Sequence, residues 1–196
     1  MNRLLFSVVA AALVALPTLA SAQDADEPAI CTDRPTKANG VCTVPPGKWQ
    51  VEADAVSFTR YEDAGTTVEI LLYTNPTLKF GLDDRSDLQI NWSPQMRVET
   101  TVGGTSSRLS GPGDLYVRYK RRLSADDATW GVSVIPFLKA PTARAGIGNR
   151  EWEGGVALPL SRSLPSGVTL TFGPEIDVLL DADGRSEEHT SELQSH

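Results

Sequence analysis

Histidine is nearly absent from this chain, because only His189 and His196 occur and both lie at its C-terminal end. A serine or cysteine nucleophile needs a neighbouring base, which is usually histidine. Two carboxylates can also divide acid and base roles, and Glu52 and Asp54 fall on one face of a predicted strand. Polar residues lining an interior explain that pair more simply. We therefore expect a protein that is not an enzyme; a barrel enzyme would need chemistry from residues outside this chain.

An excess of positive charge and a long apolar segment are both missing. The formal net charge is -7, whereas a nucleic-acid-binding surface is basic. After residue 22, charges, proline or glycine interrupt each apolar run before it reaches the roughly 20 residues of a spanning helix. The composition therefore excludes a helical membrane bundle and predicts no nucleic-acid partner.

Cysteine is scarce, with Cys31 and Cys42 as its occurrences. In an oxidising compartment such a pair is expected to form a disulfide, here closing a small loop near the mature N-terminus. A redox pair and metal ligation are the alternatives. The spacing is not C-x-x-C, however, and no histidine or second cysteine pair accompanies it. We expect a structural disulfide, no metal and no cofactor.

The two ends of the chain each carry a signature. Arg3, the apolar residues 4–16 and the small residues 20–22 form the three parts of a secretory signal peptide, so we predict cleavage after Ala22. Export of this kind, with the strand pattern below, predicts the outer membrane of a Gram-negative bacterium. Residues 185–196 resemble translated sequencing-adapter read-through, which predicts a non-native tail and a natural sequence interrupted at about Gly184.

The chain does contain a series of segments in which apolar and polar residues alternate. In residues 86–98 the apolar positions are Leu88, Ile90, Trp92, Pro94, Met96 and Val98. Successive side chains of a strand point to opposite faces, so this segment has one apolar and one polar side. A tilted strand crosses a bilayer core in about 9–11 residues. Similar segments occur at 48–58, 67–82, 114–123, 130–139, 151–161 and 168–181. We predict an all-β fold: an antiparallel up-and-down transmembrane β-barrel, truncated, with about seven strands present.

The connections between the predicted strands support this fold. Those after the second, fourth and sixth strands are short, and those after the third and fifth are longer, as in outer-membrane barrels with short periplasmic turns. The predicted organisation is a signal peptide (1–22), a periplasmic N-terminal segment (23–47), a partial barrel (48–184) and the non-native tail (185–196). Single-chain bacterial barrels have even strand counts, so an odd count indicates missing strands.

Two motifs near the N-terminus carry a family resemblance. The stretch T-D-R-P at 32–35 is followed by V-P-P-G-K-W-Q-V-E at 44–52, and P-G-D-L occurs at 112–115. These motifs resemble those of a bacterial family of outer-membrane transporter-like proteins that is labelled as the MetA-pathway of phenol degradation. The resemblance covers most of residues 32–181 and implies a β-barrel with a transport role. Cys31 and Cys42 depart from the family pattern.

Charges of both signs fall on the predicted inward faces. The candidate lumen-facing residues are Glu52, Asp54, Arg97, Arg118, Lys120, Arg122, Glu175 and Asp177. The basic residues of segment 114–123 could form a selectivity patch. Pairing with inward acids is the preferred interpretation, because charges in confined sites are usually paired.

These features predict an outer-membrane channel or transporter-like protein for small solutes, in contact with outer-membrane lipid and with an undefined solute. Two alternatives stay open. One is a structural outer-membrane barrel with a filled lumen that transports nothing. The other is a soluble periplasmic β-sandwich that binds a ligand, in which the apolar faces would meet each other instead of lipid.

Overall fold

The computed structural model describes residues 30, 32–34, 39–165, 167–180 and 186–191. The predicted signal peptide, Cys31 and part of the predicted tail lie outside these residues. The described part is all-β, and each ladder between its strands is antiparallel. The strands are β1 (Trp49–Glu52), β2 (Val56–Asp63), β3 (Thr66–Tyr73), β4 (Thr77–Asp83), β5 (Ser86–Trp92), β6 (Gln95–Val102), β7 (Thr105–Gly111), β8 (Leu115–Arg122), β9 (Gly131–Ala140), β10 (Glu153–Ala157), β11 (Leu160–Ser163), β12 (Thr169–Phe172), β13 (Glu175–Leu180) and β14 (Ser186–Ser191).

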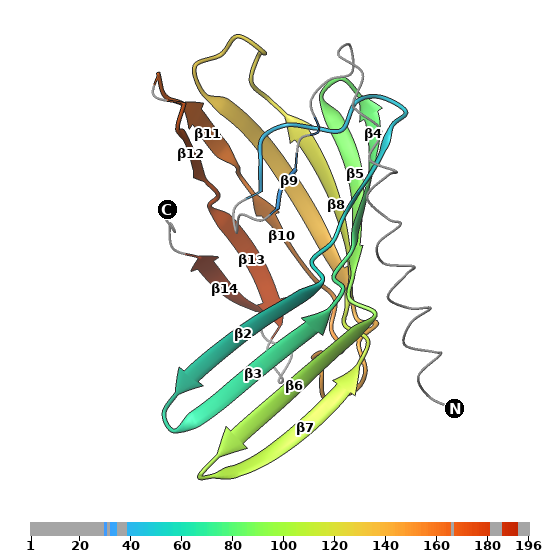
Figure 1. Ribbon diagram of the computed structural model, residues 1–196, viewed down its shortest axis with the longest axis vertical. Coiled ribbons are helices and arrows are strands. Elements are labelled where there is room, and N and C mark those ends of the chain that lie inside the picture. The colour runs from blue at the N-terminus through green and yellow to red at the C-terminus, as the bar shows by residue number, and fades with distance from the viewer. Residues whose placement is uncertain (1–29, 31, 35–38, 166, 181–185, 192–196) are drawn as a thin grey trace, which may run out of the picture.

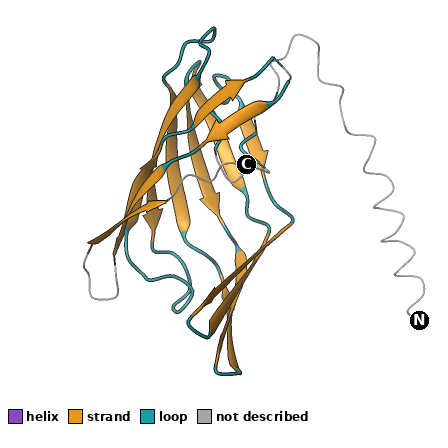
Figure 2. Cartoon of the chain, turned by 90° about the vertical axis from the view of Figure 1, so that its left-hand side faces the viewer, coloured by secondary structure: helices purple, strands orange, loops and turns teal. Residues whose placement is uncertain are grey.

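The strands form two sheets that continue one another. The larger, a 10-stranded sheet, has the order β1-β4-β5-β8-β9-β10-β13-β14, with β11 and β12 paired beside this path. The smaller sheet has the order β2-β3-β6-β7. Figure 1 shows the smaller sheet extending from one end of the larger one, and Figure 2 shows the same extension from the side. The chain therefore runs up and down between neighbouring strands, and most of its long extended segments are divided into two shorter strands.

Proline accounts for most of these interruptions. Pro76 lies between β3 and β4, Pro94 between β5 and β6, Pro112 between β7 and β8, Pro159 between β10 and β11, and Pro174 between β12 and β13. Proline has no backbone N–H to donate to a ladder, so pairing stops there. The prediction of about seven strands is therefore wrong as a count, because most predicted strands are divided and the chain forms β1 to β13 before residue 181.

Two predicted loops are hairpins in the structure. β2 and β3 are joined at Ala64 and Gly65, with φ of 44° and 82°. β6 and β7 are joined at Gly103 and Gly104, with φ of 56° and 82°. Positive φ at both central residues is the requirement of the two-residue hairpin turn that matches strand twist. The longer connection predicted after the third strand is consequently mostly strand.

The larger sheet does not close within the residues that the structure describes. Its ladder runs from β1 to β14, and no described pairing joins these two edge strands. A barrel closes only when its first and last strands pair, so this part of the chain is an open antiparallel sheet, and the barrel of which it was predicted to be a truncated part stays a prediction. β14 lies in the segment 185–196, whose predicted non-native origin stays a prediction.

The burial pattern of the larger sheet is inverted relative to a water-soluble sheet. One face, which we call the inner face, is polar and buried, with exposed fractions of 1% for Gln89 and Lys120 and 2% for Lys79. The opposite, outer face is apolar and open, with Ile90 41% and Val178 45% exposed. Cross-strand neighbours continue this outer row through Leu78, Ile90, Val117 and Leu138. The alternation predicted for residues 86–98 thus places polar side chains inside over Ser86–Trp92.

The inner face is covered by residues 32–34 and 39–45, which we call the covering segment. Its backbone receives hydrogen bonds from the sheet: Ser133 Oγ donates to Val41 O at 2.6 Å, and Lys120 Nζ donates to Cys42 O at 3.3 Å. In return, Val44 N donates to Asp87 Oδ2 at 3.0 Å. Figure 1 shows this part of the chain passing across the curved sheet.

Among the described residues, none belongs to a helix with the length and apolar character needed to cross a membrane.

Candidate functional site

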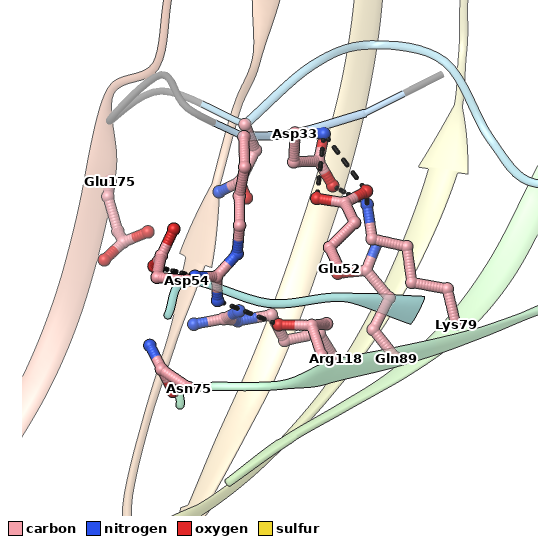
Figure 3. A pocket seen from close by; sticks show the side chains of 11 residues that line it. Asp33, Glu52, Asp54, Asn75, Lys79, Gln89, Arg118 and Glu175 are labelled. Atoms are coloured by element: carbon pink, nitrogen blue, oxygen red, sulfur yellow. Dashed lines mark hydrogen bonds and ion pairs between the residues drawn. The ribbon is translucent and has the colours of Figure 1, made fainter. Parts of the chain in front are cut away.

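A polar cavity lies between the covering segment and the inner face. Its volume is about 330 Å³. Figure 3 shows its lining, which combines residues of the covering segment with residues from β1, β4, β5, β8 and β13 and from the connections between strands. The lining residues are Asp33, Arg34, Asn39, Glu52, Asp54, Asn75, Thr77, Lys79, Gln89, Arg118 and Glu175.

Strand register explains why these polar side chains meet. Gln50 of β1 lies opposite Lys79 of β4, which lies opposite Gln89 of β5, which lies opposite Arg118 of β8. Directly paired residues point to the same face of a sheet, so one polar row crosses four strands. Thr77 extends a second row, because it pairs with both Glu52 and Asn91. The cavity is therefore built from alternate positions of short strands.

Asp33 is the centre of the most buried charge cluster of the site. Its carboxylate accepts from Lys120 Nζ at 2.7 Å (Oδ1) and 2.9 Å (Oδ2), and from Lys79 Nζ at 2.5 Å. Gly40 N donates to Asp33 Oδ1 at 2.6 Å. Lys79 Nζ also lies 2.5 Å from Glu52 Oε1, and the Asp33 backbone N–H donates to both Glu52 oxygens at 3.2 Å. Hydrogen-bonded pairing of this kind offsets the cost of burying each charge.

The pKa of Asp33 reflects two opposing effects. Burial raises the pKa of its carboxyl, and the neighbouring charges of Lys120 and Lys79 lower it, with their hydrogen bonds adding to the lowering. The net result is a pKa below the ordinary value of 3.8. Asp33 is therefore an anion at neutral pH, matched to the two ammonium groups beneath it.

A second pair holds the covering segment next to this cluster. Arg34 forms an ion pair with Asp54, and its Nη2 donates to Thr77 Oγ1 at 3.2 Å. The Arg34 side chain is 22% exposed and that of Asp54 is 38% exposed. Thr77 also accepts from Asn91 Nδ2 at 3.1 Å. Adjacent residues of the covering segment thus present an anion and a cation to the same cavity.

The far side of the cavity is formed by Arg118 and Glu175. The Arg118 guanidinium lies 5.5 Å from the centre of the Tyr116 ring. In Figure 3, Glu175 lies on the opposite side of the cavity from Lys79, with Arg118 between them. The lining thus carries both signs of charge, which suits the binding or passage of small polar solutes. Among the described residues, no group of three or more histidine, cysteine or acidic side chains is arranged to hold a metal ion.

The candidate lumen-facing residues from the sequence separate into two groups. Glu52, Asp54, Arg118 and Glu175 line the cavity, and Lys120 is buried beside it in the Asp33 cluster. The other three do not line it: Arg97 is on β6 opposite Leu71 and Ser110, and Arg122 pairs with Asp126 at 2.6 Å. Asp177 is on β13 opposite Gly155 and lies next to Glu175 on the same face of that strand. The inward acids expected to pair with Lys120 are not its partners, because Asp33 occupies that position.

Sequence reasoning missed Asp33, Arg34 and Lys79 as site residues. Lys79 had a usable signal, since Thr77 and Lys79 alternate with Leu78 and Phe80 as polar and apolar positions do on a strand. Asp33 and Arg34 lie outside any strand, so no periodicity placed them. Their only signal was the T-D-R-P motif, which carried a family resemblance and no position in space.

The predicted disulfide stays a prediction. Cys42 is not a free thiol in the structure. Cys31 lies outside the described residues, so the pairing of the two is not described.

The fold and site define an all-β protein whose sheet buries a charged, hydrogen-bonded inner face and leaves an apolar outer face open. The family model described as "Putative MetA-pathway of phenol degradation" matches residues 32–194. The chain belongs to this family, as its N-terminal motifs indicated. Comparisons with curated proteins and with solved structures found no match.

Proposed function

We propose that this protein is an outer-membrane protein of the β-barrel type that admits small polar solutes along its inner face. The observation that carries the proposal is the inverted burial of the larger sheet. Polar side chains such as Gln89 are 1% exposed, while Ile90 beside it is 41% exposed. Outer-membrane barrels have this arrangement, with an apolar lipid-facing band and a polar interior.

A soluble periplasmic sandwich fits this burial poorly. Such a fold would bury its apolar faces against each other. Here the apolar row that includes Leu78, Ile90 and Leu138 is left open, and contiguous apolar surface of that kind marks contact with lipid or another protein. Unpaired sheet edges are costly in hydrocarbon, so the proposal requires the open edges of the larger sheet to be paired in the membrane.

The location is tested by substituting a lipid-facing position and a matched control. A lysine at the lipid face near the membrane midplane costs about 2–4 kcal/mol. We expect Ile90→Lys to lower the fraction of protein that fractionates with the outer membrane and shows heat-modifiable gel migration. Val102→Lys, at the end of β6 in the smaller sheet, should leave both unchanged. Recovery of the unsubstituted protein in the soluble periplasmic fraction would refute the proposal.

A structural barrel that transports nothing is the second candidate, because the covering segment and its ion pairs fill part of the inner face. Ion conductance of the full chain in planar lipid bilayers separates the two. Discrete current steps support passage of solutes. If the protein assembles in the outer membrane and shows no current steps, the structural barrel is favoured.

A further inference from the structure

The Asp33 side chain is held as a bound carboxylate would be. Its two oxygens receive three hydrogen bonds from two lysines on different strands, at 2.5 to 2.9 Å. Lys79 comes from β4 and Lys120 from β8, and the two are 2% and 1% exposed. We propose that Lys79 and Lys120 form a binding site for a small carboxylate solute, which Asp33 occupies as an internal ligand. This inference rests on the proposed function and names its solute class.

The charge around the site favours a ligand with one negative charge over a dianion. Lys79 and Lys120 supply two positive charges, whereas Glu52, 2.5 Å from Lys79, and the buried Asp87, directly opposite Lys120, supply two negative charges. Asp33 adds one further carboxylate to this cluster, and an incoming monocarboxylate would replace it without changing the net charge. A dianion such as a phosphate ester would add excess negative charge to a buried site, which is unfavourable.

The covering segment is attached in a way that permits exchange. Its described residues belong to none of the named strands, so it can leave without breaking a ladder of either sheet. Two glycines of the larger sheet make room beneath it. A Cβ at Gly81 would lie 2.0 Å from Pro45 O, and a Cβ at Gly131 would lie 2.7 Å from Val41 Cγ2. The segment therefore rests on the sheet through close backbone approach, side-chain hydrogen bonds and the ion pairs of Asp33 and Arg34, all of which can form again with another partner.

Displacement of Asp33 would expose the lysine pair to the cavity of about 330 Å³ that already adjoins it. Lys79 is itself a lining residue, so a solute in the cavity reaches the site directly. An incoming carboxylate would take over the hydrogen bonds from Lys79 and Lys120. The covering segment then acts as a competitor of the solute for one site.

Acetate tests this competition, because it is the free counterpart of the Asp33 side chain, whose carboxylate Asp33→Ala removes. The experiment titrates carbon-13-labelled acetate into the detergent-solubilised full chain and follows its NMR line broadening. We expect saturable binding to Asp33→Ala. Binding to the unsubstituted protein should be weaker by about tenfold or more, because apparent affinity falls by the fraction of molecules whose site is free. Asp33→Ala/Lys120→Met should bind no acetate, and Asp83→Ala, which removes an exposed partner of Arg121, should match the unsubstituted protein.

Gly81→Val gives a second route that keeps Asp33 in place. Its side chain would collide with residues 44 and 45 and move the covering segment away. We expect this variant to bind acetate more tightly than the unsubstituted protein. The inference is overturned if all variants bind acetate equally. It is also overturned if Asp33→Ala and Gly81→Val keep heat-modifiable migration but bind no acetate. These binding results do not depend on conductance, so failure of the transport proposal would be seen separately in bilayers.

Discussion

The two sheets pair their charges in opposite surroundings. On the inner face of the larger sheet, Lys120 pairs with Asp33 of the covering segment, and their side chains are 1% and 9% exposed. In the smaller sheet, Arg108 and Glu99 form a pair of similar length, 2.8 Å, with side chains 57% and 24% exposed. Water screens the second pair and is excluded from the first. Two ion pairs of similar length therefore contribute differently to stability. The buried cluster holds the covering segment in place, whereas the exposed pair contributes little.

Removal of one member of each pair is expected to have the largest effect on stability. Lys120→Met leaves Asp33 short of a buried partner, and breaking a buried pair typically costs about 3–5 kcal/mol. We expect a loss of this order in the free energy of unfolding, measured by urea titration of tryptophan fluorescence in lipid vesicles. Arg108→Met is the matched control, and exposed pairs contribute about 0.2–1 kcal/mol. Equal losses in the two variants would contradict the distinction between the sheets.

Acid pH is expected to lower the stability of the buried cluster by less than the Lys120→Met substitution does. Because the pKa of Asp33 is held below 3.8 in the folded protein, its ion pairs contribute fully above that value. The contribution is lost as the pH falls through the lowered pKa of the folded state. Glu52, Lys79 and Lys120 are the charged groups that face the same carboxyl.

We therefore expect the urea midpoint to fall as the pH drops below about 4 and through the lowered pKa of the Asp33 carboxyl. Asp33→Asn should show a smaller fall over the same range, since it has no carboxyl to protonate at that position. An identical pH profile for both proteins would show that Asp33 contributes no charge-dependent stability.

Sequence periodicity predicted the faces of the strands well and their ends poorly. The alternation around Gln89 and Ile90 follows from geometry that any strand must obey, so the burial of one and the exposure of the other were predictable. The strand ends depend on proline positions such as Pro94 and on turn glycines such as Gly103 and Gly104. These prolines and glycines are visible in the sequence. The prediction nevertheless ran strands through the prolines and treated the glycine turns as loops, so the strand ends were wrong.

The candidate site was only half predictable, for a different reason. Glu52 and Arg118 were identified because each lies at an alternating position of a strand. Asp33 reaches Lys120 across 87 positions of sequence, and no local pattern encodes so distant a contact. The covering segment has no strand period, and its fit on the sheet depends on missing side chains at Gly81 and Gly131. Such a contact is a property of the assembled fold.

The smallest effect on stability is expected for the exposed charges of the smaller sheet. Across the smaller sheet, Arg60, Glu69, Glu99 and Arg108 lie directly opposite one another in turn, so two like charges are neighbours in the middle. Glu99→Gln removes the attraction to Arg108 and also the repulsion from Glu69. Like charges directly opposite destabilise a sheet, so the two losses partly cancel.

We expect Glu99→Gln to change the free energy of unfolding by less than about 0.5 kcal/mol, as for most exposed positions. Raising the salt concentration should reduce even that difference, because the Debye length shortens to about 3 Å at 1 M. The same salt titration on Lys120→Met should leave most of its deficit in place, because its pair is buried. A Glu99→Gln effect as large as that of Lys120→Met would mean that the smaller sheet also depends on its charges. Burial would then not be what distinguishes the two regions.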